Sequence, residues 1–265
     1  MLDYKIHNYI DGQDELVLIH GLGGNSNIFY KQLKSFKRHY NVITVELPGH
    51  GNSPDINSYT EDFSSQLAAQ EVIKTLDSIG IHKAHFVGVS LGTIIIHDIL
   101  KSAPEKVQSA ILAGTVTRFT PFSKFLLALG TMVKDFTPYM WIYRLFARIM
   151  MPRSNHKESR LTFVKEAMKM KRTNFLGWYD LCHKIEKSIE HVHHFAPDTP
   201  KLYVSGNEDH LFLNPLTKDI KKDLNAKLVV INSCGHVCNI EKAKQFNEIS
   251  LEFLSEQQSV LSQAN

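Results

Sequence analysis

The chain has 265 residues, of which 43% are hydrophobic and 22% charged, and its formal net charge is +3. These values are those of an ordinary globular protein, long enough for one large α/β domain plus an insertion. Its three cysteines, an odd number, argue against a disulfide framework and predict a reducing compartment, so we expect a cytoplasmic protein.

The first residues, Met1 to Lys5, lack the basic and then apolar pattern of a secretory signal. From there the chain alternates between runs typical of strands and runs with helical periodicity. Strands are predicted at residues 4–9, 16–20, 41–46, 84–89, 107–113, 201–206 and 227–232, and helices at 26–36, 61–79, 91–102, 216–224 and 241–257. This alternation predicts an α/β fold whose mostly parallel sheet is covered by helices on both faces.

A glycine-rich turn, His20-Gly21-Leu22-Gly23-Gly24, follows the second strand. Such a turn lets the backbone N–H of Leu22 point inward, where it can bind a developing negative charge. A plain tight turn between a strand and a helix is the other interpretation.

The segment Gly88-Val89-Ser90-Leu91-Gly92 lies between an apolar strand and a helical pattern, so we interpret it as a nucleophile elbow. Ser90 stands at the apex in a strained conformation, and glycines on both sides avoid a collision between helix and strand. The Leu91 N–H, at the start of the helix, would join that of Leu22 in an oxyanion hole.

Residues 117–197 interrupt the alternation with helical patterns only, so we predict an all-helical cap between core segments 1–116 and 198–265. Both tryptophans and six of the seven methionines lie in it, which favours an apolar substrate pocket, although the cap also needs a core of its own. The candidate pocket residues are His20, which precedes the cap, and Phe119, Met132, Trp141, Met150 and Trp178 within it.

The cap is also basic: residues 118–196 contain fourteen Lys or Arg against six Asp or Glu. This charge predicts either steering of anionic substrates or weak association with an anionic membrane surface, unless it is only a solvated helix face. We expect no nucleic-acid partner, because no recognition motif accompanies the charge. The sequence does not indicate an oligomeric state.

Two further candidates follow the last two predicted strands. Asp209 comes after residues 201–206, with Glu208 as the alternative acid, and His236 comes after residues 227–232. The order Ser, Asp, His is the one that accompanies a nucleophile elbow.

Ser90, Asp209 and His236 with their surroundings resemble the α/β-hydrolase superfamily, in particular its small single-domain, esterase-like branch with a helical cap. Residues 47–53, Leu-Pro-Gly-His-Gly-Asn-Ser, are similar to the "PGxGxS" loop of that branch. Thr93 departs from the pattern, since many members have a glycine there. The resemblance runs nearly from end to end, and Ser90 disfavours the members with an aspartate nucleophile.

We therefore expect a carboxylesterase or lipase-like serine hydrolase that acts on a small, apolar ester through an acyl-enzyme, without a cofactor. A C–C bond hydrolase or lyase and a thioesterase, on the same triad, are the alternatives within enzymes. A slow-turnover ligand receptor is the alternative from another class.

Two groups of Cys and His residues could be metal ligands. Cys234 and Cys238 flank His236, and His183 precedes His191, His193 and His194. Zinc needs four ligands, and no second pair lies in register near His236, so we expect small packing residues there and a solvated helix end in the other group. No metal site is predicted.

Overall fold

The computed structural model describes residues 1–189 and 196–264. Its centre is a seven-stranded sheet in the order β1-β3-β2-β4-β5-β6-β7, in which β1 runs antiparallel to β3 and the other neighbours are parallel. The strands are β1 (Tyr4–Ile6), β2 (Glu15–Ile19), β3 (Asn41–Val45), β4 (Ala84–Val89), β5 (Val107–Ala113), β6 (Lys201–Gly206) and β7 (Ala226–Ile231). The predicted α/β class and its mostly parallel sheet are confirmed.

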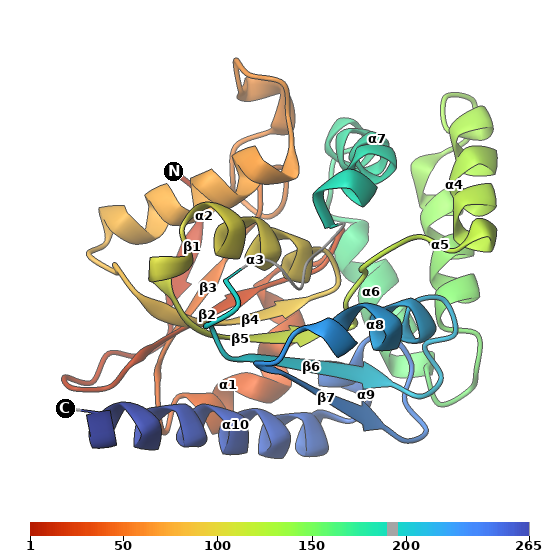
Figure 1. Cartoon of the computed structure of the whole chain (residues 1–265). Helices are drawn as coiled ribbons and strands as arrows, with labels where there is room; N and C mark the ends of the chain where they lie inside the picture. The colour runs from red at the N-terminus through yellow and green to blue at the C-terminus, as the bar shows by residue number, and fades with distance from the viewer. Residues whose placement is uncertain (190–195, 265) are drawn as a thin grey trace.

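Helices cover both faces of the sheet (Figure 1). Helices α1 (Tyr30–Phe36) and α10 (Ala243–Ala264) lie on one face, and α2 (Ser65–Ser78) and α3 (Leu91–Ser102) lie on the other. Two shorter helices, α8 (Leu213–Asp219) and α9 (Cys238–Glu241), follow the last two strands. Because both faces are covered, the central strands β3 and β4 are buried along their whole length instead of alternating between buried and exposed residues.

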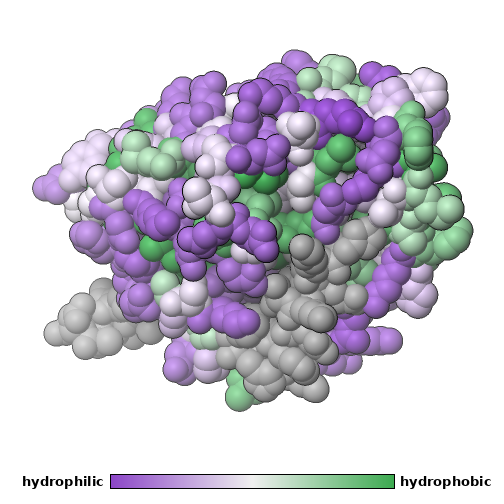
Figure 2. All heavy atoms as spheres, turned by 90° about the horizontal axis from the view of Figure 1, so that it is seen from above, coloured by the Kyte–Doolittle hydropathy of each residue, from purple (hydrophilic) through white to green (hydrophobic). Residues whose placement is uncertain are grey.

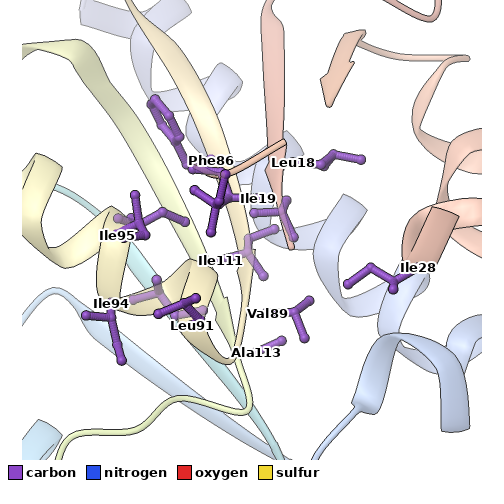
Figure 3. Packing of buried hydrophobic residues seen from close by; sticks show 14 of the residues in the cluster. Leu18, Ile19, Ile28, Phe86, Val89, Leu91, Ile94, Ile95, Ile111 and Ala113 are labelled. Carbon is purple, nitrogen blue, oxygen red and sulfur yellow. The ribbon is translucent and has the colours of Figure 1, made fainter. Parts of the chain in front are cut away.

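The core beside the elbow consists of aliphatic and aromatic side chains from β2, β4, β5 and α3 (Figure 3). Leu18, Phe86, Ile95 and Ile111 are at most 1% exposed. Truncating one such side chain to alanine typically costs about 2–5 kcal/mol of stability, so this packing holds the end of β4 and the start of α3 in place.

Some predicted boundaries shift for local reasons. The first strand ends at Ile6, since the Asn8 side chain then accepts from the Val42 N–H in place of a ladder bond. Helix α2 begins at Ser65 instead of residue 61, because Ser64 caps it by accepting the Leu67 N–H. The segment 26–36 starts as a 3₁₀ helix, Ser26–Phe29, before α1, and the last helix runs seven residues beyond the predicted 257.

In the described part of the chain between β5 and β6, where we predicted the cap, there are four α-helices. They are α4 (Pro121–Val133), α5 (Tyr139–Met150), α6 (Lys157–Ala167) and α7 (Arg172–Ile189), and they are called the helical insertion below. In Figure 1 they lie beside the core, past the carboxyl ends of the central strands. The described part of residues 117–197 contains no strand. Among the described helices, none has the length and apolarity needed to cross a membrane.

Candidate active site

Ser90 joins β4 to α3 through a backbone conformation that L-residues rarely adopt, with φ 53° and ψ −113°. Such strain costs on the order of 1–3 kcal/mol and persists only where the surroundings enforce it. Here the Ser90 N–H donates to the Ala113 carbonyl at 2.9 Å. A side chain on Gly92 would strike the Ile19 carbonyl oxygen, and one on Gly88 would lie 2.7 Å from the carbonyl carbon of Gly92. The two glycines therefore let α3 fold back over the sheet.

Thr93, the departure from the family pattern, has a local role. Its hydroxyl donates to the Ser90 carbonyl oxygen at 2.7 Å, and its N–H donates to the same oxygen at 2.9 Å. A glycine would supply only the second bond, so the threonine adds a restraint on the turn.

The structure brings Ser90, His236 and Asp209 together. His236 Nδ1 lies 2.7 Å from Asp209 Oδ2, and His236 Nε2 lies 3.0 Å from Ser90 Oγ. With Nδ1 as the donor to the carboxylate, Nε2 is left to accept the serine proton. Asp209 and His236 are at most 1% exposed, which strengthens the hydrogen bond between them.

The loops after β6 and β7 hold the acid and the histidine against each other. The Glu208 N–H donates to the Cys234 carbonyl at 2.8 Å, which ties the two loops. The alternative acid, the Glu208 side chain, turns the other way and bonds His156 at 2.7 Å and Asn155 at 2.8 Å. Of the two carboxylates, only that of Asp209 lies within hydrogen-bond distance of His236.

The loop that carries Leu22 is held from behind by two side chains that the sequence did not single out. His50 Nε2 accepts from the Gly23 N–H at 3.0 Å, and the Tyr143 hydroxyl donates to the Leu22 carbonyl at 2.8 Å. Burial lowers the pKa of His50 to about 3, so its ring stays a neutral acceptor at ordinary pH. His50 stands in the motif-bearing loop 47–53, whereas Tyr143 is on α5 and carries no sequence signal.

Leu22, Ser90 and His236 line one small hollow of about 20 Å³. Leu91 is the first residue of α3, so its N–H is one of the donors that a helix start leaves without an intrahelical partner. This arrangement fits the oxyanion hole that we expected from the Leu22 and Leu91 N–H groups, whose role stays a prediction.

A larger cavity of about 270 Å³ adjoins this hollow. Leu22 lines both spaces, and Phe212 lines the larger one while its ring centroid lies 5.2 Å from that of His236. Among the described lining residues, the polar side chains belong to Ser123, Tyr143, Tyr179 and Cys182, and none is charged. Burial raises the pKa of the Cys182 thiol to about 12, so this cysteine is not an activated nucleophile.

Of the six candidate pocket residues, only Phe119 lines this cavity; the other five line neither it nor the hollow at Ser90. His20 is buried under the oxyanion loop, where its Nδ1 lies 2.8 Å from the Gly21 carbonyl oxygen. Met150 and Trp178 are core residues, and the Trp178 indole donates to Pro48 O at 2.8 Å. Met132 and Trp141 are 75% and 67% exposed, because they project from the outer faces of α4 and α5.

The metal alternatives gain no geometric support. Both ring nitrogens of His236 face Ser90 and Asp209, and Cys234 and Cys238 are buried free thiols. The described residues include no group of three or more His, Cys, Asp or Glu arranged to hold a metal ion. His191, His193 and His194 lie outside the described residues.

Residues 15–243 match the family model described as "alpha/beta hydrolase fold", so the chain belongs to that family. It is 28% identical over 257 residues to a protein of Pseudomonas savastanoi named putative carbamate hydrolase RutD, covering 91% of this chain and 94% of that one. It is 28% identical over 263 residues to a 2-hydroxy-6-oxononadienedioate/2-hydroxy-6-oxononatrienedioate hydrolase of Burkholderia vietnamiensis, covering 92% of this chain and 88% of that protein.

A solved structure with a similar fold is the enol-lactonase from Burkholderia xenovorans. Its TM-score is 0.77 at 20% identity, and the match covers 96% of each chain. A hydrolase from Oleispira antarctica has a TM-score of 0.81 at 17% identity, with 96% of this chain and 94% of that chain covered. At these identities the solved structures establish the fold alone, while the family and the curated relatives identify a hydrolase.

Proposed function

We propose that this hydrolase cleaves carboxylic esters that carry an apolar acyl or alcohol group. The observation that carries the proposal is the position of a mostly apolar cavity, whose described lining residues carry no charge, beside the aligned Ser90, His236 and Asp209. Leu22 lines both this cavity and the hollow at the serine, so an ester bond at Ser90 would place its apolar group in the cavity.

In the proposed mechanism, His236 Nε2 takes the proton of Ser90 Oγ as this oxygen attacks the ester carbonyl carbon. Asp209 holds the ring by accepting from Nδ1–H and stabilises the imidazolium that forms. The N–H groups of Leu22 and Leu91 bind the oxyanion, a contribution worth about 100- to 1000-fold in rate for each donor. His236 then protonates the leaving alcohol, and water repeats the sequence to release the acid. No step requires a cofactor.

The names of the curated relatives suggest two other classes of substrate, a carbamate and a dicarboxylate. A dicarboxylate substrate needs a cation to receive its remote carboxylate, because an unpaired charge is costly to bury. The described residues that line the two cavities include neither Lys nor Arg. The apolar ester therefore fits the site better than a dianion does.

A panel of p-nitrophenyl esters from acetate to palmitate tests the proposal, with the wild type compared with Ser90→Ala. We expect turnover by the wild type, a preference for medium or long acyl chains, and a loss in the variant on the order of a millionfold in kcat. Lactones, thioesters and an aryl carbamate in the same panel would reveal another leaving group.

If the wild type turns over none of these esters, simple ester hydrolysis is wrong. A vinylogous diketone substrate would then test C–C cleavage, and a ligand-induced rise in the melting temperature without turnover would support a receptor. The cytoplasmic location stays a prediction.

A further inference from the structure

Helix α4 carries an apolar stripe on the side that faces solvent. Phe122, Phe125, Leu129, Met132 and Val133 recur at helical spacing, and they are between 39% and 75% exposed. A surface helix normally turns such a stripe toward the core. Here the inner side of α4 is apolar as well, because Leu126 and Leu127 line the large cavity. Of the five stripe residues, Phe122, Phe125 and Met132 line neither cavity, so burial inside the molecule does not explain why they are apolar.

The connection to α5 and α5 itself extend this surface. Phe136 is 91% exposed, Trp141 67% and Leu145 59%. We call these three residues and the five of the α4 stripe the apolar face. Figure 2 shows hydrophobic residues gathered at the edge of the molecule on the side where α4 lies in Figure 1. Single exposed apolar side chains are common, but a contiguous group of this size marks an interaction surface.

The apolar face is continuous with the mouth of the large cavity. Leu129, Val133 and Leu145 line the cavity and are also 45%, 39% and 59% exposed. At its other end the cavity reaches Leu22, which borders Ser90. The described residues that line the cavity between the apolar face and Leu22 are therefore all uncharged.

The charges around the apolar face select its partner. Arg144 and Arg148 are exposed, and their helical spacing from Trp141 and Leu145 places all four on the same side of α5. Neither arginine forms an ion pair with a described residue. Between the start of α4 and the end of α5, residues 121–150, the sequence contains one acidic residue, Asp135. A second copy of the chain would bring like charges together, since residues 118–196 have eight more basic than acidic residues.

We propose that the apolar face docks on an anionic lipid bilayer. Trp141, Phe125 and Phe136 would enter the interface, where aromatic rings are favourable, and the arginines would contact lipid phosphates. Apolar esters then reach Ser90 from the bilayer through the cavity mouth, a part that rests on the proposed function.

Vesicle flotation with the inactive Ser90→Ala protein tests the docking without any turnover. The vesicles contain phosphatidylcholine, either alone or mixed with phosphatidylglycerol. We expect flotation with the mixed vesicles, and at least tenfold weaker partitioning after Phe125→Ser and Trp141→Ser. The matched control is Leu161→Ser with Leu224→Ser, two leucines that are 59% and 98% exposed outside the apolar face. Arg144→Gln with Arg148→Gln should weaken binding to the mixed vesicles about fivefold for each arginine and leave binding to neutral vesicles unchanged.

The docking proposal is wrong if the protein binds neither kind of vesicle. It is also wrong if Phe125→Ser and Trp141→Ser float with the mixed vesicles as well as the control pair does. It is also wrong if Phe125→Ser and Trp141→Ser convert a dimer to a monomer while no vesicle binding occurs, because a second copy of the chain then covers the apolar face.

The supply of esters from the bilayer is tested separately with the active wild type. If the wild type hydrolyses an ester faster when it is embedded in vesicles than without vesicles, and Phe125→Ser and Trp141→Ser lose this increase, the supply of esters from the bilayer is supported. Equal rates with and without vesicles contradict it. Failure of ester hydrolysis itself leaves the flotation result intact.

Discussion

Two adjacent carboxylates illustrate how far the surroundings of a residue decide its role. Asp209 bonds His236 at 2.7 Å, whereas Glu208 is engaged by His156 and Asn155 and forms an ion pair with Arg153. The sequence favoured Asp209 and kept Glu208 as the alternative, because two residues next to each other after a strand share the same strand end. Which side chain turns toward the histidine is decided by the loop and its contacts.

This difference predicts opposite outcomes for two isosteric substitutions. Asp209→Asn should lower kcat on a p-nitrophenyl ester by about 10,000-fold, because an amide cannot hold the His236 ring in the required tautomer. Glu208→Gln should stay within a few-fold of the wild type, because Glu208 does not contact His236. Steady-state kinetics with circular dichroism as a folding check measure both. Equal losses in the two variants would refute the assignment of the acid to Asp209.

At the scale of elements, the sheet explains why so much of the site could be predicted. The carboxyl ends of β2, β4, β6 and β7 meet at one edge, so motifs far apart in the chain converge there. The sequence could not show which side of a helix faces the core. The composition of the helical insertion, rich in methionine and tryptophan, predicts Met132 and Trp141 in the pocket, yet α4 and α5 turn both side chains to solvent.

The contact between α5 and the loop after β2 was also beyond the sequence. Tyr143 is 1% exposed, and its hydroxyl holds the carbonyl of Leu22, the residue whose N–H we assign to the oxyanion hole. The ring also fills the space beside Gly23, where an added Cβ would lie 2.6 Å from the hydroxyl. The helical insertion therefore holds the loop that we propose to form the oxyanion hole, as well as lining the cavity.

Tyr143→Phe should lower kcat about tenfold and change KM little, because the loop loses a restraint that matters most in the transition state. The loss of one such hydrogen bond should also lower the free energy of unfolding by about 1 kcal/mol. The matched control is Tyr179→Phe. Tyr179 lines the same cavity, and its hydroxyl donates to the Leu127 carbonyl at 2.6 Å, away from the loop that carries Leu22. We expect the control to keep the wild-type kcat, and an equal loss in both variants would mean that the effect is general loosening of the insertion.

At the scale of the whole molecule, stability against pH should reflect a buried carboxyl behind the elbow. Asp98 on α3 is 3% exposed. Burial raises its pKa from 3.8 to about 6, although the hydrogen bond from Ser65 and the charge of Lys101 each lower it. Between these two pH values the unfolded chain releases a proton that the folded protein retains, so the free energy of unfolding falls as the pH rises. Above pH 6 the loss is complete, at about 3 kcal/mol.

Asp98→Asn should remove this dependence, because the amide is close in shape to the protonated acid and never ionises. We expect the variant to match the wild type near pH 4 and to exceed its free energy of unfolding by about 3 kcal/mol at pH 7, as measured by urea denaturation across this range. Asp77→Asn is the control of opposite sign. The hydrogen bond from Lys106 lowers the pKa of Asp77, so removing that carboxylate should destabilise the protein above pH 4 and not below it. Parallel curves for the wild type and Asp98→Asn would show that Asp98 is not the group that sets the dependence.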